Sequence, residues 1–72
     1  MRTTKKEIRE VGESIATILN TKNETNVYYF DEAWGVVKCH NNIFDVIVCA
    51  QNTDYKTYKK LVAIRDVLCE LK

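Results

Sequence analysis

The 72-residue sequence contains no proline and only two glycines, and both scarcities bear on its order. Disordered chains are often rich in these residues and poor in hydrophobic ones, whereas hydrophobic residues make up 46% here. A domain of this size buries roughly 60% of its extended surface, which leaves little room for an enclosed ligand cavity. We therefore expect residues 1–72 to form a single ordered domain.

Long apolar runs and paired cysteines are missing as well. The longest uninterrupted apolar run, VIVCA at 46–50, is far too short to cross a bilayer, and residues 1–10 lack the apolar core of a secretory signal. The three cysteines are an odd number without CxxC spacing, which does not make a disulfide framework. These absences predict a cytoplasmic protein with reduced thiols and no membrane partner.

Charge of one sign is also scarce, because the formal net charge is only +1. Residues 1–10 hold four basic and two acidic groups, and residues 54–72 hold five basic and three acidic groups. Residues 11–53 hold two basic and five acidic groups, so the two ends are mildly basic and the middle is acidic. Nucleic-acid binding draws its affinity from neutralised phosphates and usually shows a much stronger basic excess. The charge pattern therefore gives a nucleic-acid partner only weak support.

The residues needed for catalysis or metal binding are few and separated. The single histidine, His40, adjoins Cys39, but neighbouring strand residues point to opposite faces and cannot readily share a metal ion. Asp31 and Glu32 are adjacent carboxylates that fit a solvated turn, without a histidine or third ligand beside them. We therefore expect a protein that is not an enzyme and that binds no metal, cofactor or small-molecule substrate.

What the sequence does contain is a clear order of secondary structure. Thr4-Lys5-Lys6-Glu7 has the spacing of a capping box, and apolar residues follow at steps of three and four to about Asn20. A second amphipathic helix, with cap candidates Asn52-Thr53-Asp54, runs toward the C-terminus. The prediction is an α+β fold of helix, three-stranded antiparallel meander and helix, with the helices on one face of the sheet. The predicted strands, rich in β-branched and aromatic residues, are 27–30, 34–40 and 43–51.

A hairpin turn at Asn41-Asn42 sets the predicted register of the last two strands. Asparagine tolerates the left-handed backbone angles that a two-residue turn requires. Lys38 then faces Asp45, and alternation places this charged pair on the outer, solvent face. The opposite face is apolar and is expected to lie under the helices. Its residues are Gly35, Val37, Cys39, Phe44, Val46, Val48 and Ala50.

The predicted outer face also carries large apolar side chains, which soluble monomers rarely leave exposed unless a partner covers them. If Asp31 and Glu32 form the first inter-strand turn, Tyr29 joins Trp34 on this face. A register wrong by one residue, or a linker folded over the face, would remove the patch. Otherwise the face is a protein-binding surface, for a second copy or for another protein. The predicted protein-binding residues are Tyr29, Asp31, Glu32, Trp34, Val36 and Ile47.

Basic residues on the two predicted helices support an alternative. Lysines in the first turns of the last helix oppose its dipole and are locally unfavourable there. In its helix–three strands–helix order, its length and these lysines, the chain resembles the double-stranded RNA-binding domain. The resemblance implies that the lysines contact phosphates. The chain lacks that family's glycine-rich approach to the helix and the glycine, proline and histidine of its first inter-strand loop, which here reads DEAW. The nucleic-acid-binding residues under this alternative are Lys5, Lys6, Arg9, Lys56, Lys59 and Lys60.

Composition also suggests a biological setting, by association rather than by physical argument. Small, proline-free chains rich in asparagine and lysine, without a catalytic constellation, are typical of phage or mobile-element proteins that bind and block a host protein. The preferred prediction is a non-enzymatic protein–protein interaction module, either an inhibitor or adaptor of a host protein or a homodimer through the outer sheet face.

Overall fold

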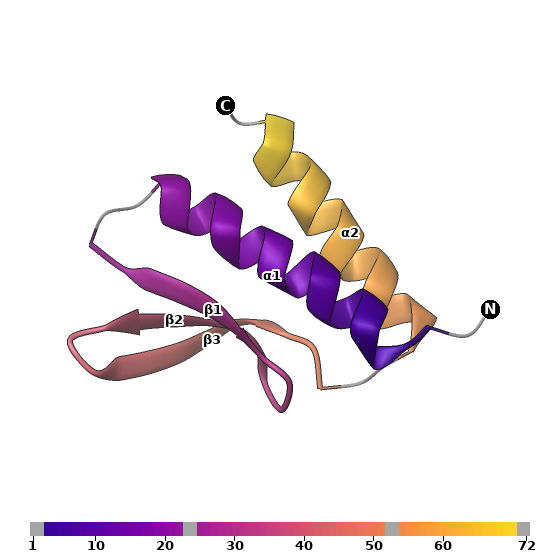
Figure 1. Cartoon of the computed structure of the whole chain (residues 1–72), viewed down its shortest axis with the longest axis horizontal. Coiled ribbons are helices and arrows are strands. Elements are labelled where there is room, and N and C mark those ends of the chain that lie inside the picture. The colour runs from indigo at the N-terminus through magenta and orange to yellow at the C-terminus, as the bar shows by residue number, and fades with distance from the viewer. Residues whose placement is uncertain (1–2, 23–24, 52–53, 71–72) are drawn as a thin grey trace.

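The elements follow one another in the predicted order (Figure 1). This computed structural model describes residues 3–22, 25–51 and 54–70. The strands form one antiparallel sheet in the order β1-β2-β3. The α+β class, the meander and the flanking helices are therefore confirmed. The elements are α1 (Lys5–Lys22), β1 (Val27–Asp31), β2 (Gly35–His40), β3 (Ile43–Cys49) and α2 (Tyr55–Glu70).

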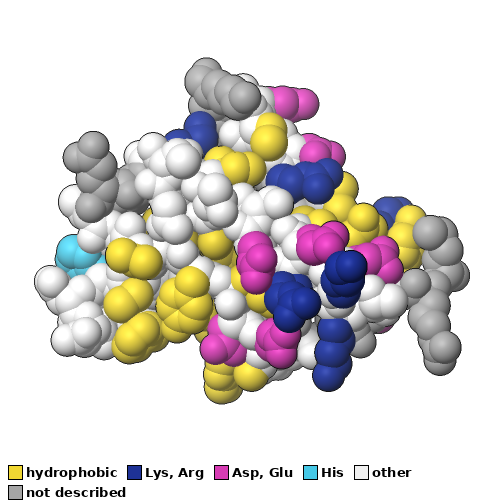
Figure 2. Space-filling view, viewed as in Figure 1, with side chains coloured by type: hydrophobic (Ala, Val, Ile, Leu, Met, Phe, Trp, Pro, Cys, Tyr) yellow, Lys and Arg dark blue, Asp and Glu magenta, His cyan; other side chains and the backbone are white. Residues whose placement is uncertain are grey.

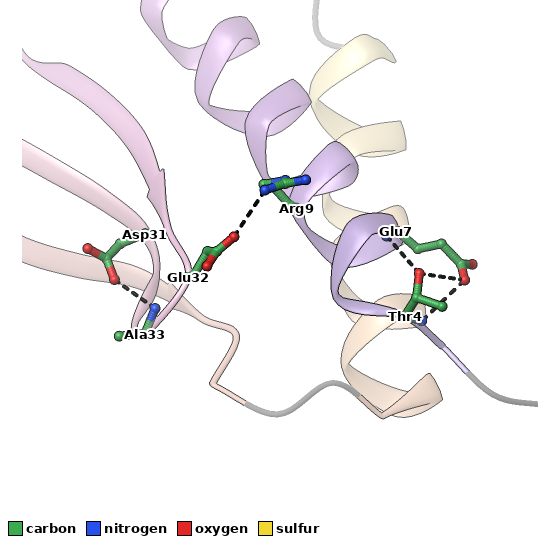
Figure 3. A network of polar contacts seen from close by, with 6 residues as sticks. All are labelled: Thr4, Glu7, Arg9, Asp31, Glu32 and Ala33. Carbon is green, nitrogen blue, oxygen red and sulfur yellow. Dashed lines mark hydrogen bonds and ion pairs between the residues drawn. The ribbon is translucent and has the colours of Figure 1, made fainter.

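α1 begins at the predicted capping box, which Thr4 and Glu7 close reciprocally (Figure 3). The backbone N–H of Glu7 donates to Thr4 Oγ1 at 3.2 Å, and Glu7 Oε1 accepts from the backbone N–H of Thr4 at 3.2 Å. These bonds satisfy amides that a first helical turn leaves without intrahelical partners. One face of α1 is then buried as the periodicity predicts. Its buried residues are Ile8, Val11, Gly12, Ile15 and Ala16.

α2 begins directly after Asp54, whose Oδ1 accepts the backbone N–H of Thr57 at 2.8 Å. The other predicted cap candidates, Asn52 and Thr53, lie outside the described residues. Hydrogen bonds from the Thr57 side chain and backbone hold the pKa of the Asp54 carboxyl below its ordinary value of 3.8, and the charge of Lys56 adds to this lowering. Asp54 is therefore the N-cap of α2, and its charged form is the one that the helix end favours.

Both helices lie on the same side of the sheet, and α1 makes the main contact with the strands (Figure 1). α1 packs on β1 and β2, and α2 packs mainly against α1. The hydrophobic core joins the three layers through Ile15 of α1, Val36 and Val48 of the sheet, and Leu61 of α2. Val48 is the only buried residue of β3, so most of that strand extends beyond the helices.

The β2–β3 hairpin keeps the predicted register near its turn and loses it at a β-bulge. Asn41 and Asn42 have φ values of 50° and 63°, in the left-handed region that the turn requires. The four pairs nearest the turn, from His40–Ile43 to Val37–Val46, are as predicted. Val36 then pairs with Val48 in place of the predicted Ile47, which leaves Ile47 as the extra residue.

β2 and the part of β3 before the bulge take the opposite faces from those predicted, whereas Val48, beyond the bulge, is buried under the helices as predicted. Val36 was predicted on the outer face, but its side chain is fully buried in the core cluster. Val37, Phe44 and Val46 were predicted under the helices, but they line the opposite face with Tyr29. The face prediction was wrong because both alternating sets of β3 side chains are apolar. The hydrophobic pattern alone then cannot decide which set faces the core.

Two further expectations about the sheet need correction. The first inter-strand turn is not Asp31-Glu32, because Asp31 is still paired with Gly35 and residues 32–34 form the connection. The Lys38–Asp45 pair forms, with Nζ and Oδ2 3.9 Å apart, but alternation puts it on the same side as Val36. That side is solvated at the hairpin tip because the helices cover only the other end.

Candidate protein-binding surface

The sheet face that points away from the helices contains an open hollow of about 440 Å³. Residues from all three strands and from the first inter-strand turn line it. Five of the lining residues are aromatic or aliphatic, and Asp31 is the one charged residue among them. We name this set the outer-face hollow: Tyr29, Asp31, Trp34, Val37, Phe44 and Val46.

Four of the five apolar residues that line the outer-face hollow are exposed to solvent. The exposed fraction is 54% for Trp34, 60% for Phe44, 45% for Val46 and 38% for Tyr29, while Val37 is buried at the base. In Figure 2, hydrophobic side chains gather over the strands, whereas acidic and basic side chains mix over the helices. An exposed cluster with two large aromatic rings is the kind of patch that marks an interaction surface.

The turn between β1 and β2 positions Trp34 at the hollow. Asp31 Oδ1 accepts the backbone N–H of Ala33 at 2.8 Å (Figure 3). It also accepts the backbone N–H of Trp34 at 3.2 Å. The carbonyl oxygen of Trp34 accepts the backbone N–H of Ala50 at 3.1 Å. Gly35 follows with φ 119°, where a Cβ would also collide with the carbonyl oxygen of Val48. The backbone of Trp34 is therefore fixed from both sides.

The two adjacent carboxylates predicted at this turn have separate roles. Asp31 lines the hollow and organises the turn, whereas Glu32 points toward α1 (Figure 3). Arg9 Nη1 donates to Glu32 Oε1 at 3.1 Å. Both side chains are largely exposed, and such pairs contribute little to stability. The pair links the turn to α1. It also places Arg9, which the nucleic-acid alternative expects at a phosphate, in an ion pair within the chain.

The remaining predicted protein-binding residues fall outside the outer-face hollow. Val36 is in the core, and Ile47 is exposed but lies at the bulge and does not line the hollow. The prediction missed Val37, Phe44 and Val46. One signal for them was present in the sequence: β3 has apolar side chains on both alternating sets, and a sheet with helices on one face can bury only one set.

The basic residues of the nucleic-acid alternative lie at the N-terminal ends of the two helices, and all six are exposed. Arg9 is paired with Glu32, and Lys59 Nζ lies 5.7 Å from the centre of the Tyr55 ring. Acidic side chains are interleaved with basic ones over the helices in Figure 2. The face in that view therefore offers phosphates no continuous basic stripe.

Other chemistry finds little support in the described part of the chain. Residues 3–22, 25–51 and 54–70 contain no group of three His, Cys, Asp or Glu side chains placed to hold a metal ion. His40 Nδ1 lies 3.1 Å from the carbonyl oxygen of Thr25, and all three cysteines are free thiols. Neither described helix has the combined length and apolar character that crossing a bilayer demands.

Comparison of the chain with protein-family models, curated proteins and solved structures finds no match.

Proposed function

We propose that this chain is a non-enzymatic protein-binding module that captures a partner protein in the outer-face hollow. The observation that carries the proposal is the exposed apolar cluster of Tyr29, Trp34, Phe44 and Val46 around the buried Val37. An inhibitor or adaptor would act through such a surface by covering part of its partner.

The lining of the hollow indicates the chemistry of the partner. Aromatic and aliphatic walls favour an apolar side chain as the inserted group, because burying apolar surface contributes roughly 25 cal/mol per Å². Asp31 is the only charged residue among the described residues that line the hollow, and its carboxylate attracts a cation. The partner segment should therefore present an aromatic or aliphatic anchor beside a lysine or arginine.

The first test selects ligands from a random peptide library displayed on phage, with the immobilised chain as bait. We expect enriched peptides to combine an apolar anchor with a basic residue. Replacing Trp34 with serine should weaken their binding at least tenfold, since truncating an interface tryptophan typically costs about 2 kcal/mol or more. Titration calorimetry with a synthesised peptide measures the loss, and circular dichroism checks the fold.

A matched charge variant separates this function from the nucleic-acid alternative. Lys56→Glu, Lys59→Glu and Lys60→Glu together leave the outer-face hollow intact, so peptide affinity should hold within about twofold. Enriched peptides that bind Trp34→Ser and Phe44→Ser variants as tightly as wild type would refute the proposal. Tight binding of a 20-base-pair RNA duplex, abolished by the lysine variant, would favour the alternative instead.

A further inference from the structure

From Ile43 to Ile47, β3 is open to solvent on both faces, and the strand lies at an edge of the sheet. Four large hydrophobic side chains of this one strand are exposed: Ile43, Phe44, Val46 and Ile47. Alternation places Phe44 and Val46 on the outer face and Ile43 on the side of the helices, beyond the part that they cover. A ligand bound to one face would leave the other apolar set in water. A strand added at the edge would bring apolar neighbours to the side chains on both faces of β3.

At the opposite edge of the sheet, the backbone of Tyr28 on β1 already has a partner. Asn20, near the end of α1, donates from Nδ2 to the carbonyl oxygen of Tyr28 and accepts the Tyr28 backbone N–H at Oδ1, both at 2.8 Å. Its side-chain amide thus takes the place that a peptide group of another strand would take beside β1. No described side chain makes such a bond with the backbone of β3. The two edges therefore differ, and β3 is the one available for strand pairing.

The hairpin geometry shows which backbone groups are available. After a two-residue turn, the flanking residue Ile43 exchanges backbone hydrogen bonds with β2, as does Asp45 two positions on. Phe44 and Val46 direct their N–H and C=O groups to the open edge instead. The bulge lies beyond Val46, so the segment Ile43–Val46 is a regular edge strand. It contains no lysine or proline, the residues that commonly protect such edges.

We propose that β3 pairs antiparallel with β3 of a second copy, forming a twofold dimer with a continuous six-stranded sheet. The occupant is a second copy because β3 is itself a strand with apolar residues on both faces, as the edge requires. An alignment centred on Phe44 brings that residue opposite its own copy and Asp45 opposite Ile43. This alignment avoids facing two Asp45 carboxylates, and it joins outward-directed backbone groups of the two Phe44 residues.

The dimer would leave the outer-face hollows usable. A twofold axis normal to the sheet keeps both outer faces on one side, and Tyr29 lies on β1, two strands from the paired edge. Two hollows then lie side by side and can engage a partner with two copies of the binding segment. Dimerisation through the β3 edge does not require peptide capture in the hollow, so each can be tested without the other.

The test is solution mass, measured by sedimentation equilibrium over a hundredfold range of concentration with two matched variants. Wild type should approach twice its 8.4 kDa mass. Ile43→Glu does not touch the hollow but puts a carboxylate opposite Asp45 of the second copy, so this variant should remain monomeric. Tyr29→Lys alters the hollow on β1, at the other edge of the sheet, and should dimerise like wild type. Circular dichroism confirms that both variants are folded.

Hydrogen exchange adds a readout specific to strand pairing. The Phe44 amide should exchange at least tenfold more slowly at the highest concentration than at the lowest, because its N–H becomes bonded only in the dimer. A wild-type chain that is monomeric throughout would overturn the proposal. Dissociation by Tyr29→Lys but not by Ile43→Glu, with Phe44 exchange independent of concentration, would overturn it in favour of face-to-face contact through the hollows.

Discussion

At the scale of single residues, Gly12 and Phe30 determine how closely α1 approaches the sheet. A glycine inside a helix costs roughly 0.5–1 kcal/mol relative to alanine, so its presence needs a compensating gain. Here a Cβ at position 12 would overlap the ring of Phe30 on β1. The missing side chain allows the ring to pack directly on the helix backbone, and this contact holds the sheet at its observed distance from α1.

We predict that Gly12→Ala destabilises the protein by about 1–3 kcal/mol, although alanine is the better helix former. The added methyl group must displace the Phe30 ring or move α1 away from β1. Urea denaturation followed by circular dichroism measures the change. Thr17→Ala, at an exposed position of the same helix, should change stability by less than about 0.5 kcal/mol.

A second variant identifies the cause of that loss. In a Phe30→Leu background, which removes the ring, Gly12→Ala should cost less than in wild type, giving a coupling energy of about 1 kcal/mol. Equal losses in both backgrounds would show that the strain arises elsewhere. A gain in stability from Gly12→Ala alone would mean that α1 does not approach β1 so closely.

At the scale of elements, the ends of helices were predictable because their signals are local. The capping box of Thr4 and Glu7 and the cap at Asp54 each depend on residues within three positions, and both form. The sequence did not predict which side chains of β3 face the helices, because this depends on a bulge that the hydrophobic pattern does not indicate. Ile47 is the extra residue, and its neighbours Val46 and Val48 end on opposite faces. The structure has an apolar outer face, but of its apolar lining residues only Tyr29 and Trp34 were assigned to it, and Val36 was assigned to it in error.

The cap of α2 gives a pH dependence whose sign follows from Asp54. Its pKa is lower in the folded protein than the ordinary 3.8, so the charged carboxylate favours the folded helix end. This contribution is fully present above pH 3.8 and is lost as the pH falls through the lowered folded-state value. We predict that the Thr57 amide resonance shifts with a midpoint below 3.8 in an NMR titration.

Asp54→Asn is the control for that titration. Asparagine keeps an oxygen that can accept the Thr57 N–H but carries no titrating group, so the Thr57 resonance should lose this acid transition. A wild-type midpoint at or above 3.8 would contradict the assignment of Asp54 as a charged cap.

At the scale of the whole molecule, Trp34 reports which surface another chain covers. It is the only tryptophan, and 54% of it is exposed at the outer-face hollow. Pairing through β3 joins edges and leaves that hollow facing solvent, whereas a ligand bound in the hollow removes the indole from water. The two proposals therefore predict different responses of one fluorophore.

We predict that the tryptophan emission maximum stays constant over the concentration range in which the chain dimerises. It should move to shorter wavelength when a library-selected peptide is added, because the indole then leaves water for an apolar contact. Fluorescence spectra recorded on the samples used for sedimentation make the comparison direct. A shift to shorter wavelength on dimerisation alone would mean that two copies meet through their outer-face hollows, and Ile43→Glu should then leave both the dimer and the shift intact.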